Sequence, residues 1–341
     1  MLIEDHARDL LPDWLRFVRG VVDSEDIPLN VSREMVQKTA VVRKIREGVT
    51  KRILKELNDW SEEAPPAAGT EDDAETKAPY ADFWRNFGVL LKEGYYHDRA
   101  KWGELLLPLL RFNAASHDDD KGLVSLAEYR KAMPPTQDTI WYLTAESRAS
   151  ALASPHLEAF RKRGWNVLLL TDPVDEWLVG VLDAYEGMPV KSIARGALDL
   201  KDDDAADAGE EKADLTGFAP WLKEVLGDSV VEVRASSRLT DSAVVLVDAD
   251  QGMSANMERI LKQANAENAG RSRRILELNT RHPLIRNLTK MVEAGQKDQA
   301  LPLARMLYDE AMLLEGAVHE PASLGRRLQD LLTRASESAL R

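Results

Sequence analysis

The sequence contains no cysteine among its 341 residues. Disulfides, thiolate nucleophiles and cysteine-ligated metal sites are therefore excluded. A metal-binding helix is not predicted either, because no two histidines lie three or four residues apart. The histidines are His6, His97, His117, His156, His282 and His319.

Long apolar runs and an excess of basic residues are also lacking. No run approaches the roughly 20 residues that a membrane-spanning helix needs, and the start "MLIEDHARDLL" has no basic region of the kind that secretory signals carry. A formal net charge of -13 argues against a nucleic-acid partner. With 44% apolar and 30% charged residues, the composition is typical of a soluble globular protein. We therefore expect a cytoplasmic protein with no membrane partner.

Apolar periodicity predicts a helical first part, then a small parallel sheet, then a second α+β part. The first part has predicted helices at 7–18, 41–60 and 80–112. Three strands are predicted next, at 139–143, 164–170 and 189–193. A helix is predicted between each pair of consecutive strands, the second of them at 175–186. This alternation indicates a parallel βαβαβ unit with right-handed crossovers. Beyond it, strands at 230–236 and 243–249 are predicted to pair antiparallel, followed by a third strand at 273–279. Predicted helices lie at 215–226, 253–264, 284–294, 299–315 and 322–336, with Gly316 as a helix stop and Pro321 as a helix start.

Two acidic, alanine-rich segments interrupt these patterns. Residues 61–79 read "SEEAPPAAGTEDDAETKAP" and predict a flexible loop. Residues 201–214 read "KDDDAADAGEEKAD" and predict a linker at a domain boundary. The fold class that we predict is α/β and α+β, with the final helices forming a hairpin.

A self-contained active site does not emerge. The turns after the first two parallel strands, "LTAESRAS" and "LTDPVDEW", lack the glycines that let backbone amides approach a phosphate. No nucleophile elbow is present, and "DDDK" at 118–121 is better explained as a solvated loop than as a cation site. The parallel sheet is therefore interpreted as a scaffold.

Two apolar features leave both a core and a binding interpretation open. Trp177 follows two acids in "VDEWLVG", in helical register with Val181. The segment "MSANMERIL" places Met253, Met257, Ile260 and Leu261 on one helical face. Core packing is the simpler interpretation of both, but methionine-rich faces also suit adaptable binding because thioether side chains repack easily.

Several long segments resemble the bacterial branch of the heat-shock protein 90 family of chaperones. They read "WLRFVRGVVDSEDIPLNVSREMVQ" (14–37), "FGVLLKEG" (87–94), "SPHLEAFRKRGWNVLLLTDPVDEW" (154–177), "RLTDSAVVLVDADQGMSANM" (238–257) and "ELNTRHPLI" (277–285). The resemblance covers nearly the whole chain. It implies an ATP-dependent chaperone for unfolded or partly folded client proteins, associated with the heat-shock response.

The family has an N-terminal ATP-binding domain, a middle domain and a C-terminal dimerisation domain. The resemblance begins within the middle domain and lacks the ATP-binding domain. It implies the end of a large middle subdomain at 1–37, a helical connector at 38–134, a small α/β middle subdomain at 135–200, the linker at 201–214 and a dimerisation domain at 215–341. We therefore expect this chain alone to bind no cofactor and to be inactive as an ATPase, although the intact family uses ATP and Mg²⁺.

The resemblance also assigns roles to residues. From composition, Arg33 in "LNVSRE" would be a surface ion-pair partner; the resemblance instead implies that it reaches the ATP γ-phosphate on the absent domain, supported by Asn30 and Gln37. Client contacts are implied at Trp177 and on the helix that carries Met253, Met257, Ile260 and Leu261. The implied homodimer interface consists of Leu303, Met306, Leu307, Leu314, Leu324, Leu328, Leu331 and Leu332. Two other functions remain as alternatives, a small α/β enzyme and a dimeric scaffold without chaperone action.

Overall fold

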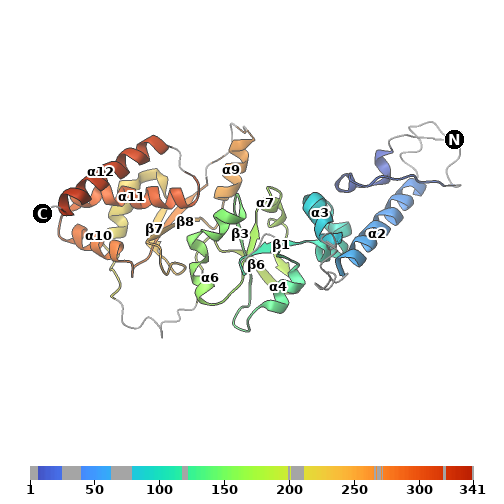
Figure 1. The fold of residues 1–341 in the computed structure, drawn as a ribbon, viewed down its shortest axis with the longest axis horizontal. Helices are drawn as coiled ribbons and strands as arrows, with labels where there is room; N and C mark the ends of the chain where they lie inside the picture. Colours follow the sequence, from blue (N-terminus) through green and yellow to red (C-terminus); the bar gives the residue numbers. More distant parts are fainter. Residues whose placement is uncertain are drawn as a thin grey trace, which may run out of the picture. The chain divides into compact units, whose positions relative to one another are not determined.

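The computed structural model describes residues 7–24, 40–62, 79–116, 122–198, 200, 211–264, 266, 270, 272–317 and 320–339 (Figure 1). The chain divides into two compact units. Unit 1 comprises Met1–Ala132 and Val174–Gly187, and unit 2 comprises Met133–Pro173 and Met188–Arg341. The predicted domain boundaries follow the family and not these units, so they stay a prediction. The central parts of both acidic segments lie outside the described residues.

Unit 1 is mainly helical. Its long helices are α2 (Ala40–Glu62) and α3 (Pro79–Leu106), which pack against each other. Short elements follow: a 3₁₀ helix (Leu107–Leu109), the antiparallel pair β1 (Phe112–Ala114) and β2 (Leu123–Val124), α4 (Leu126–Ala132), α7 (Asp175–Leu178) and β5 (Ala184–Tyr185). The predictions for 41–60 and for most of 80–112 are thus confirmed.

Two helix predictions in unit 1 were wrong in extent. Residues 7–18 form two 3₁₀ helices, Arg8–Leu10 and Asp13–Leu15, because Pro12 between them is extended and has no amide hydrogen to continue a helix. Residues 175–186 are helical only as far as Leu178; turns and β5 follow. In both places the apolar spacing arises from side chains that enter the core from irregular backbone.

Trp14 anchors the first of these segments on α3. Its indole is 3% exposed, and its Nε1 donates to Asp98 Oδ2 at 2.7 Å. A Cβ at Gly94 would lie 2.6 Å from the Trp14 ring, so only glycine permits this close approach. Asp98 itself has non-helical angles (φ -122°, ψ 24°) and marks a kink inside α3.

Unit 2 contains the predicted parallel sheet. Its strands are β3 (Ile140–Thr144), β4 (Leu168–Leu170) and β6 (Met188–Ser192), and β3 pairs in parallel with the other two. The connection from β3 to β4 contains α5 (Arg148–Leu152), a 3₁₀ helix (Pro155–Leu157) and α6 (Glu158–Lys162). The three predicted strands and their parallel direction are confirmed.

The second sheet of unit 2 has the order β7-β9-β8. Its strands are β7 (Glu232–Ala235), β8 (Val244–Asp248) and β9 (Arg274–Leu278). The predicted antiparallel pairing of the first two strands was wrong, because β9 lies between them, parallel to β7 and antiparallel to β8. Every residue of both β8 and β9 is buried, whereas the ends of β7 are exposed, so burial alone does not decide which of the two buried strands is central.

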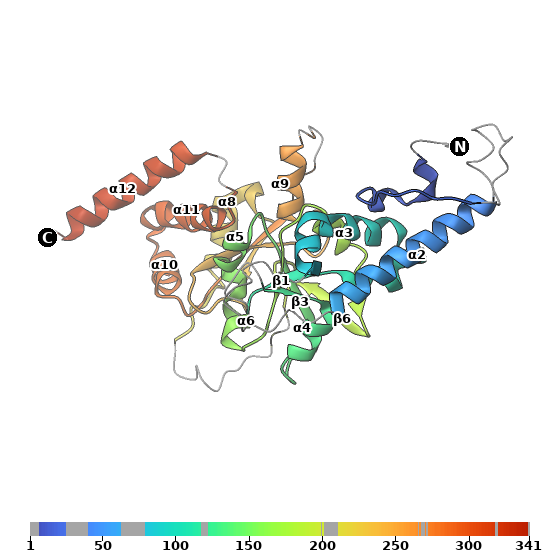
Figure 2. The ribbon, with the colours of Figure 1, turned by 45° about the vertical axis from the view of Figure 1, so that its right-hand side comes forward.

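Five described α-helices belong to this part of unit 2, and the last of them packs against the one before it (Figure 2). They are α8 (Phe218–Leu226), α9 (Ala255–Gln263), α10 (Pro283–Glu293), α11 (Lys297–Leu314) and α12 (Pro321–Ala339). A core of strand and helix side chains includes Phe218, Leu246, Leu276, Leu288 and Leu307. Gly316 has φ +67° just after α11, and α12 begins at Pro321, so the predicted stop and start are both confirmed. None of the described helices is long and apolar enough to cross a membrane.

The two sheets of unit 2 are joined through polar groups of the motif "RLTDS" (238–242), of which Arg238 is fully buried. The Glu158 carboxylate, at the start of α6, accepts the backbone amides of Thr240 at 2.7 Å and Asp241 at 2.8 Å. The guanidinium of Arg238 is fully buried; it donates to the carbonyls of Ile193 and Gly196 and to Glu277 on β9. Because every charge here has a partner, the junction tolerates burial.

We expect Arg238→Met to lower the free energy of unfolding of unit 2 by roughly 3–5 kcal/mol, because it leaves a buried carboxylate short of its main cation. Urea denaturation followed by circular dichroism measures this. The matched control is Arg234→Met, which removes the second cation that pairs with Glu277. The Arg234 side chain is 23% exposed. A loss from Arg238→Met no larger than that of the control would contradict the assignment.

Candidate functional site

The helix α9 carries the predicted methionine face. Ser254 caps it, since its side chain accepts the amide of Met257 at 3.0 Å. Asp248 Oδ1 accepts the amide of Ala255 at 3.0 Å, which fixes the start of the helix on β8. None of the residues of α9 is buried, and its apolar side chains are only partly covered. These are Met257, Ile260 and Leu261, with Met253 just before the helix.

Polar contacts hold the other face of α9. Arg259 Nη1 lies 3.5 Å from Glu146 Oε1, and Glu258 accepts the Lys262 ammonium at 2.6 Å and the Ser272 hydroxyl at 2.6 Å. Burial alone would raise the pKa of Glu258, but these hydrogen bonds outweigh it and lower the pKa to about 2. Ion pairs and hydrogen bonds therefore hold the polar face of the helix in place, while its apolar face remains partly exposed.

Trp177 lies in unit 1, on α7. Asp175 and Leu178 of this four-residue helix are fully buried, whereas Trp177 is partly exposed. The side chain is therefore neither a core residue nor a free surface residue. The apolar candidates of α9 are on one helix of unit 2, and Trp177 belongs to the other unit.

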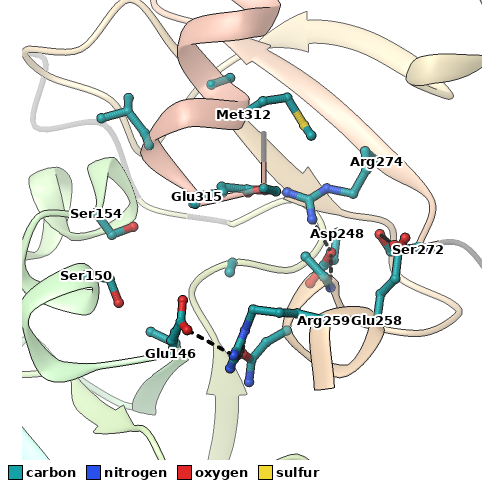
Figure 3. Close-up of a pocket in the computed structure, with 18 of the residues that line it drawn as sticks. Glu146, Ser150, Ser154, Asp248, Glu258, Arg259, Ser272, Arg274, Met312 and Glu315 are labelled. Atoms are coloured by element: carbon teal, nitrogen blue, oxygen red, sulfur yellow. Dashed lines mark hydrogen bonds and ion pairs between the residues drawn. The ribbon is translucent and has the colours of Figure 1, made fainter. Parts of the chain in front are cut away.

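A cavity of about 660 Å³ lies beside α9 in unit 2 (Figure 3). It is lined by the loop after β3, by α5, by α9, and by the end of α11. The polar side chains facing it include Glu146, Ser150, Ser154, Asp248, Glu258, Arg259, Ser272, Arg274 and Glu315.

The wall of the cavity contains two carboxylates that share one guanidinium. Arg274 Nη1 lies 3.3 Å from Asp248 Oδ1, and Arg274 Nη2 donates to Glu315 Oε1. Three buried atoms near them have no hydrogen-bond partner among the described residues: Arg274 Nε, Glu315 Oε2 and His156 Nδ1. Burial raises the pKa of Glu315 to about 7, although Arg274 opposes the shift. Burial also lowers the pKa of His156 well below its usual range, so this imidazole is neutral.

Sequence reasoning missed this cluster. Asp248, Arg274 and Glu315 belong to β8, β9 and the end of α11, so no local spacing brings them together. The only signal was the composition itself: an Arg and an Asp at the ends of two strongly apolar strands. Such charges at the ends of buried strands are the ones that need partners from elsewhere in the chain.

The predicted dimer residues lie on α11 and α12. Most of them line an apolar groove of about 280 Å³ between these helices and α10. Its lining residues are Leu284, Leu303, Met306, Leu307, Glu310, Leu313, Leu324, Leu328 and Leu331. Leu332 is 62% exposed, and Leu314 lines the cavity beside α9 and not the groove. Arg33, Asn30 and Gln37 lie outside the described residues, so their role stays a prediction.

Glu315 gives unit 2 a pH-dependent stability. The folded state holds its proton more tightly than the unfolded chain, whose pKa is near 4.5. This stabilisation is fully present below about pH 4.5 and is lost as the pH rises through about 7. We expect a loss on the order of 3 kcal/mol across this window in the wild type and a much smaller one in Glu315→Gln, measured as urea midpoints against pH. Glu293→Gln, at an exposed site on α10, is the control. Equal pH slopes for wild type and Glu315→Gln would refute the assignment.

Comparison with known proteins gives a consistent result. The family model described as Hsp90 protein matches residues 1–339. Proteins named Chaperone protein HtpG are similar to this chain: that of Burkholderia lata is 45% identical over 336 residues, which is 97% of this chain and 51% of the relative. The protein of Burkholderia cenocepacia gives the same values, and that of Polaromonas naphthalenivorans is 44% identical over 339 residues, again 97% and 51%.

The chain thus spans about half the length of the curated relatives that it matches. The family match, in contrast, covers almost every residue of this chain. The resemblance predicted from the sequence is confirmed, and the chain belongs to the Hsp90 protein family.

Proposed function

We propose that the chain is part of an ATP-dependent molecular chaperone that binds unfolded or partly folded proteins and assembles as a homodimer. The observation that carries this proposal is α9, an amphipathic helix none of whose residues is buried. If the apolar face of α9 served only to pack against the core of this chain, the side chains of Met257, Ile260 and Leu261 would be buried. The name of the relatives, Chaperone protein HtpG, supports the same function.

Client binding through α9 and Trp177 fits this chemistry. Unfolded chains expose apolar side chains without a fixed geometry, and methionine and tryptophan supply adaptable or large apolar contacts. The polar face of α9 is fastened to Glu146 and Ser272, so binding on the apolar face does not require the helix to move. The proposed client-binding residues are therefore Trp177 in unit 1 and Met253, Met257, Ile260 and Leu261 in unit 2, each unit taken by itself.

The groove between α10, α11 and α12 supports the homodimer. Leu313, Leu328 and Leu332 are 59%, 46% and 62% exposed, which leaves an apolar stripe without a partner among the described residues of this chain. A second copy of the same two helices would cover it in a four-helix arrangement, as the family resemblance implies. Nucleotide turnover would need Arg33 and a nucleotide-binding partner, and it stays a prediction, as does the cytoplasmic location.

We expect Trp177→Arg to weaken binding to an unfolded protein by roughly tenfold or more without lowering the melting temperature, because a partly exposed anchor contributes to binding and little to folding. Met257→Asp should act in the same direction. Fluorescence anisotropy with labelled, reduced and carboxymethylated α-lactalbumin measures the affinity. Trp60→Arg is the control, since Trp60 is 37% exposed on α2 of the same unit. Unchanged affinity in both test variants would exclude this client surface.

Leu328→Asp should convert the dimer into a monomer. An isologous interface contains each substitution twice, so the change removes two leucines and introduces two carboxylates into an apolar contact. Each leucine contributes roughly 1.5–3 kcal/mol when buried. Sedimentation velocity at micromolar concentration should show two chains for the wild type and for the neighbouring, exposed Gln329→Asp, but one chain for Leu328→Asp. A wild-type monomer would contradict the proposal.

A further inference from the structure

A buried ion pair in unit 1 joins α3 to α7, the short helix that carries Trp177. Lys92 Nζ on α3 is 2.8 Å from Asp175 Oδ1, the first residue of α7, and the two side chains are only 4% and 1% exposed. Burying either charge alone would cost several kcal/mol. Each therefore constrains where the other can lie.

The ammonium group is held by more than the carboxylate. It lies 5.9 Å from the ring centroid of Trp84 and 5.3 Å from that of Phe112. Such contacts with aromatic faces favour a cation in that position. Because Trp84 belongs to α3 and Phe112 to β1, Lys92 is fixed by two elements before α7 contributes its carboxylate.

The helix α7 depends on its contacts with the rest of unit 1 for its orientation. It has four residues, which is too short to be stable on its own. Its buried residues Asp175 and Leu178 are three positions apart and share one face, whereas Trp177 is partly exposed and, by helical spacing, belongs to another face. The contacts of Asp175 and Leu178 therefore decide the direction in which the Trp177 indole is presented.

We propose that Lys92 and Asp175 are positioning residues that set the orientation of Trp177 for client binding. This inference rests on the client surface proposed above. Neither residue contacts the client. An apolar pair at the two sites would fill the same volume, but it would lack the direction that a charge pair imposes.

The test separates stability from positioning. Lys92→Met leaves the Asp175 carboxylate buried without its lysine, so we expect both a lower melting temperature and weaker client binding. The double variant Lys92→Met with Asp175→Leu removes both charges, and apolar replacements of buried ion pairs are often neutral or stabilising. We therefore expect the double variant to regain its melting temperature and to bind labelled, carboxymethylated α-lactalbumin still roughly fivefold more weakly than the wild type.

Two further variants test whether the effect on client binding passes through Trp177. In a Trp177→Ala background the same double substitution should have no further effect on affinity, because its effect acts through Trp177. Arg85→Met is the control, since it removes an exposed ion pair with Asp82 on the same helix α3 and should leave affinity unchanged.

The outcomes distinguish the inference from the proposed function. If Trp177→Arg leaves α-lactalbumin binding unchanged, the client role of Trp177 is wrong. If Trp177→Arg weakens binding while the folded double variant binds like the wild type, the positioning role is wrong. An equal loss from the double substitution with and without Trp177 would also overturn it, because the effect would then not pass through this side chain.

Discussion

The buried guanidinium of Arg238 is the constraint on which the architecture of unit 2 depends. A charge that is fully removed from water must find all its partners inside the protein. Arg238 finds them on the segment after β6, through the carbonyls of Ile193 and Gly196, and on β9, through Glu277. The parallel sheet and the second sheet therefore cannot separate without exposing these groups. The same junction places Asp248 beside the segment after β6, and Asp248 in turn fixes the start of α9.

The balance of charges distinguishes the three buried networks. Lys92 pairs with Asp175, and Glu277 accepts two guanidinium groups, from Arg234 and Arg238. Arginine does not lose its proton near neutral pH, so a surplus of arginine cannot be relieved by titration. Around Arg274 there are two carboxylates for one guanidinium group, and a carboxylate can lose its charge by binding a proton. Burial is the main cause that raises the pKa of Glu315 to about 7, and the neighbouring Asp248 carboxylate adds to it, so this cluster responds to pH near neutrality.

The sequence predicted elements whose cause is local and failed where the cause is not. The long helices α2, α10, α11 and α12 and the parallel strands follow from apolar spacing. Proline starts α10 and α12, and Gly316 follows the end of α11. The segment 175–186 was mistaken for a helix because its apolar residues approach the core from turns. Strand β9 occupies the place beside β7 that was predicted for β8, because strand order depends on contacts between distant segments of the chain, which apolar spacing does not report. In the site, α9 was found from its spacing, whereas the cluster around Arg274 joins residues that share no local pattern.

Residue size on α11 differs between the side that faces the core and the side that faces the groove. The residues that face the core are Ala300, Ala304, Leu307 and Ala311, mostly small, and they let the helix lie close to β8. The larger Leu303, Met306 and Leu313 point toward the groove that α12 closes only in part. If stability of one chain were the sole demand, the large side chains would fill the core and the small ones would face water. Leu313 on the groove side stays 59% exposed, an arrangement that fits the proposed homodimer interface.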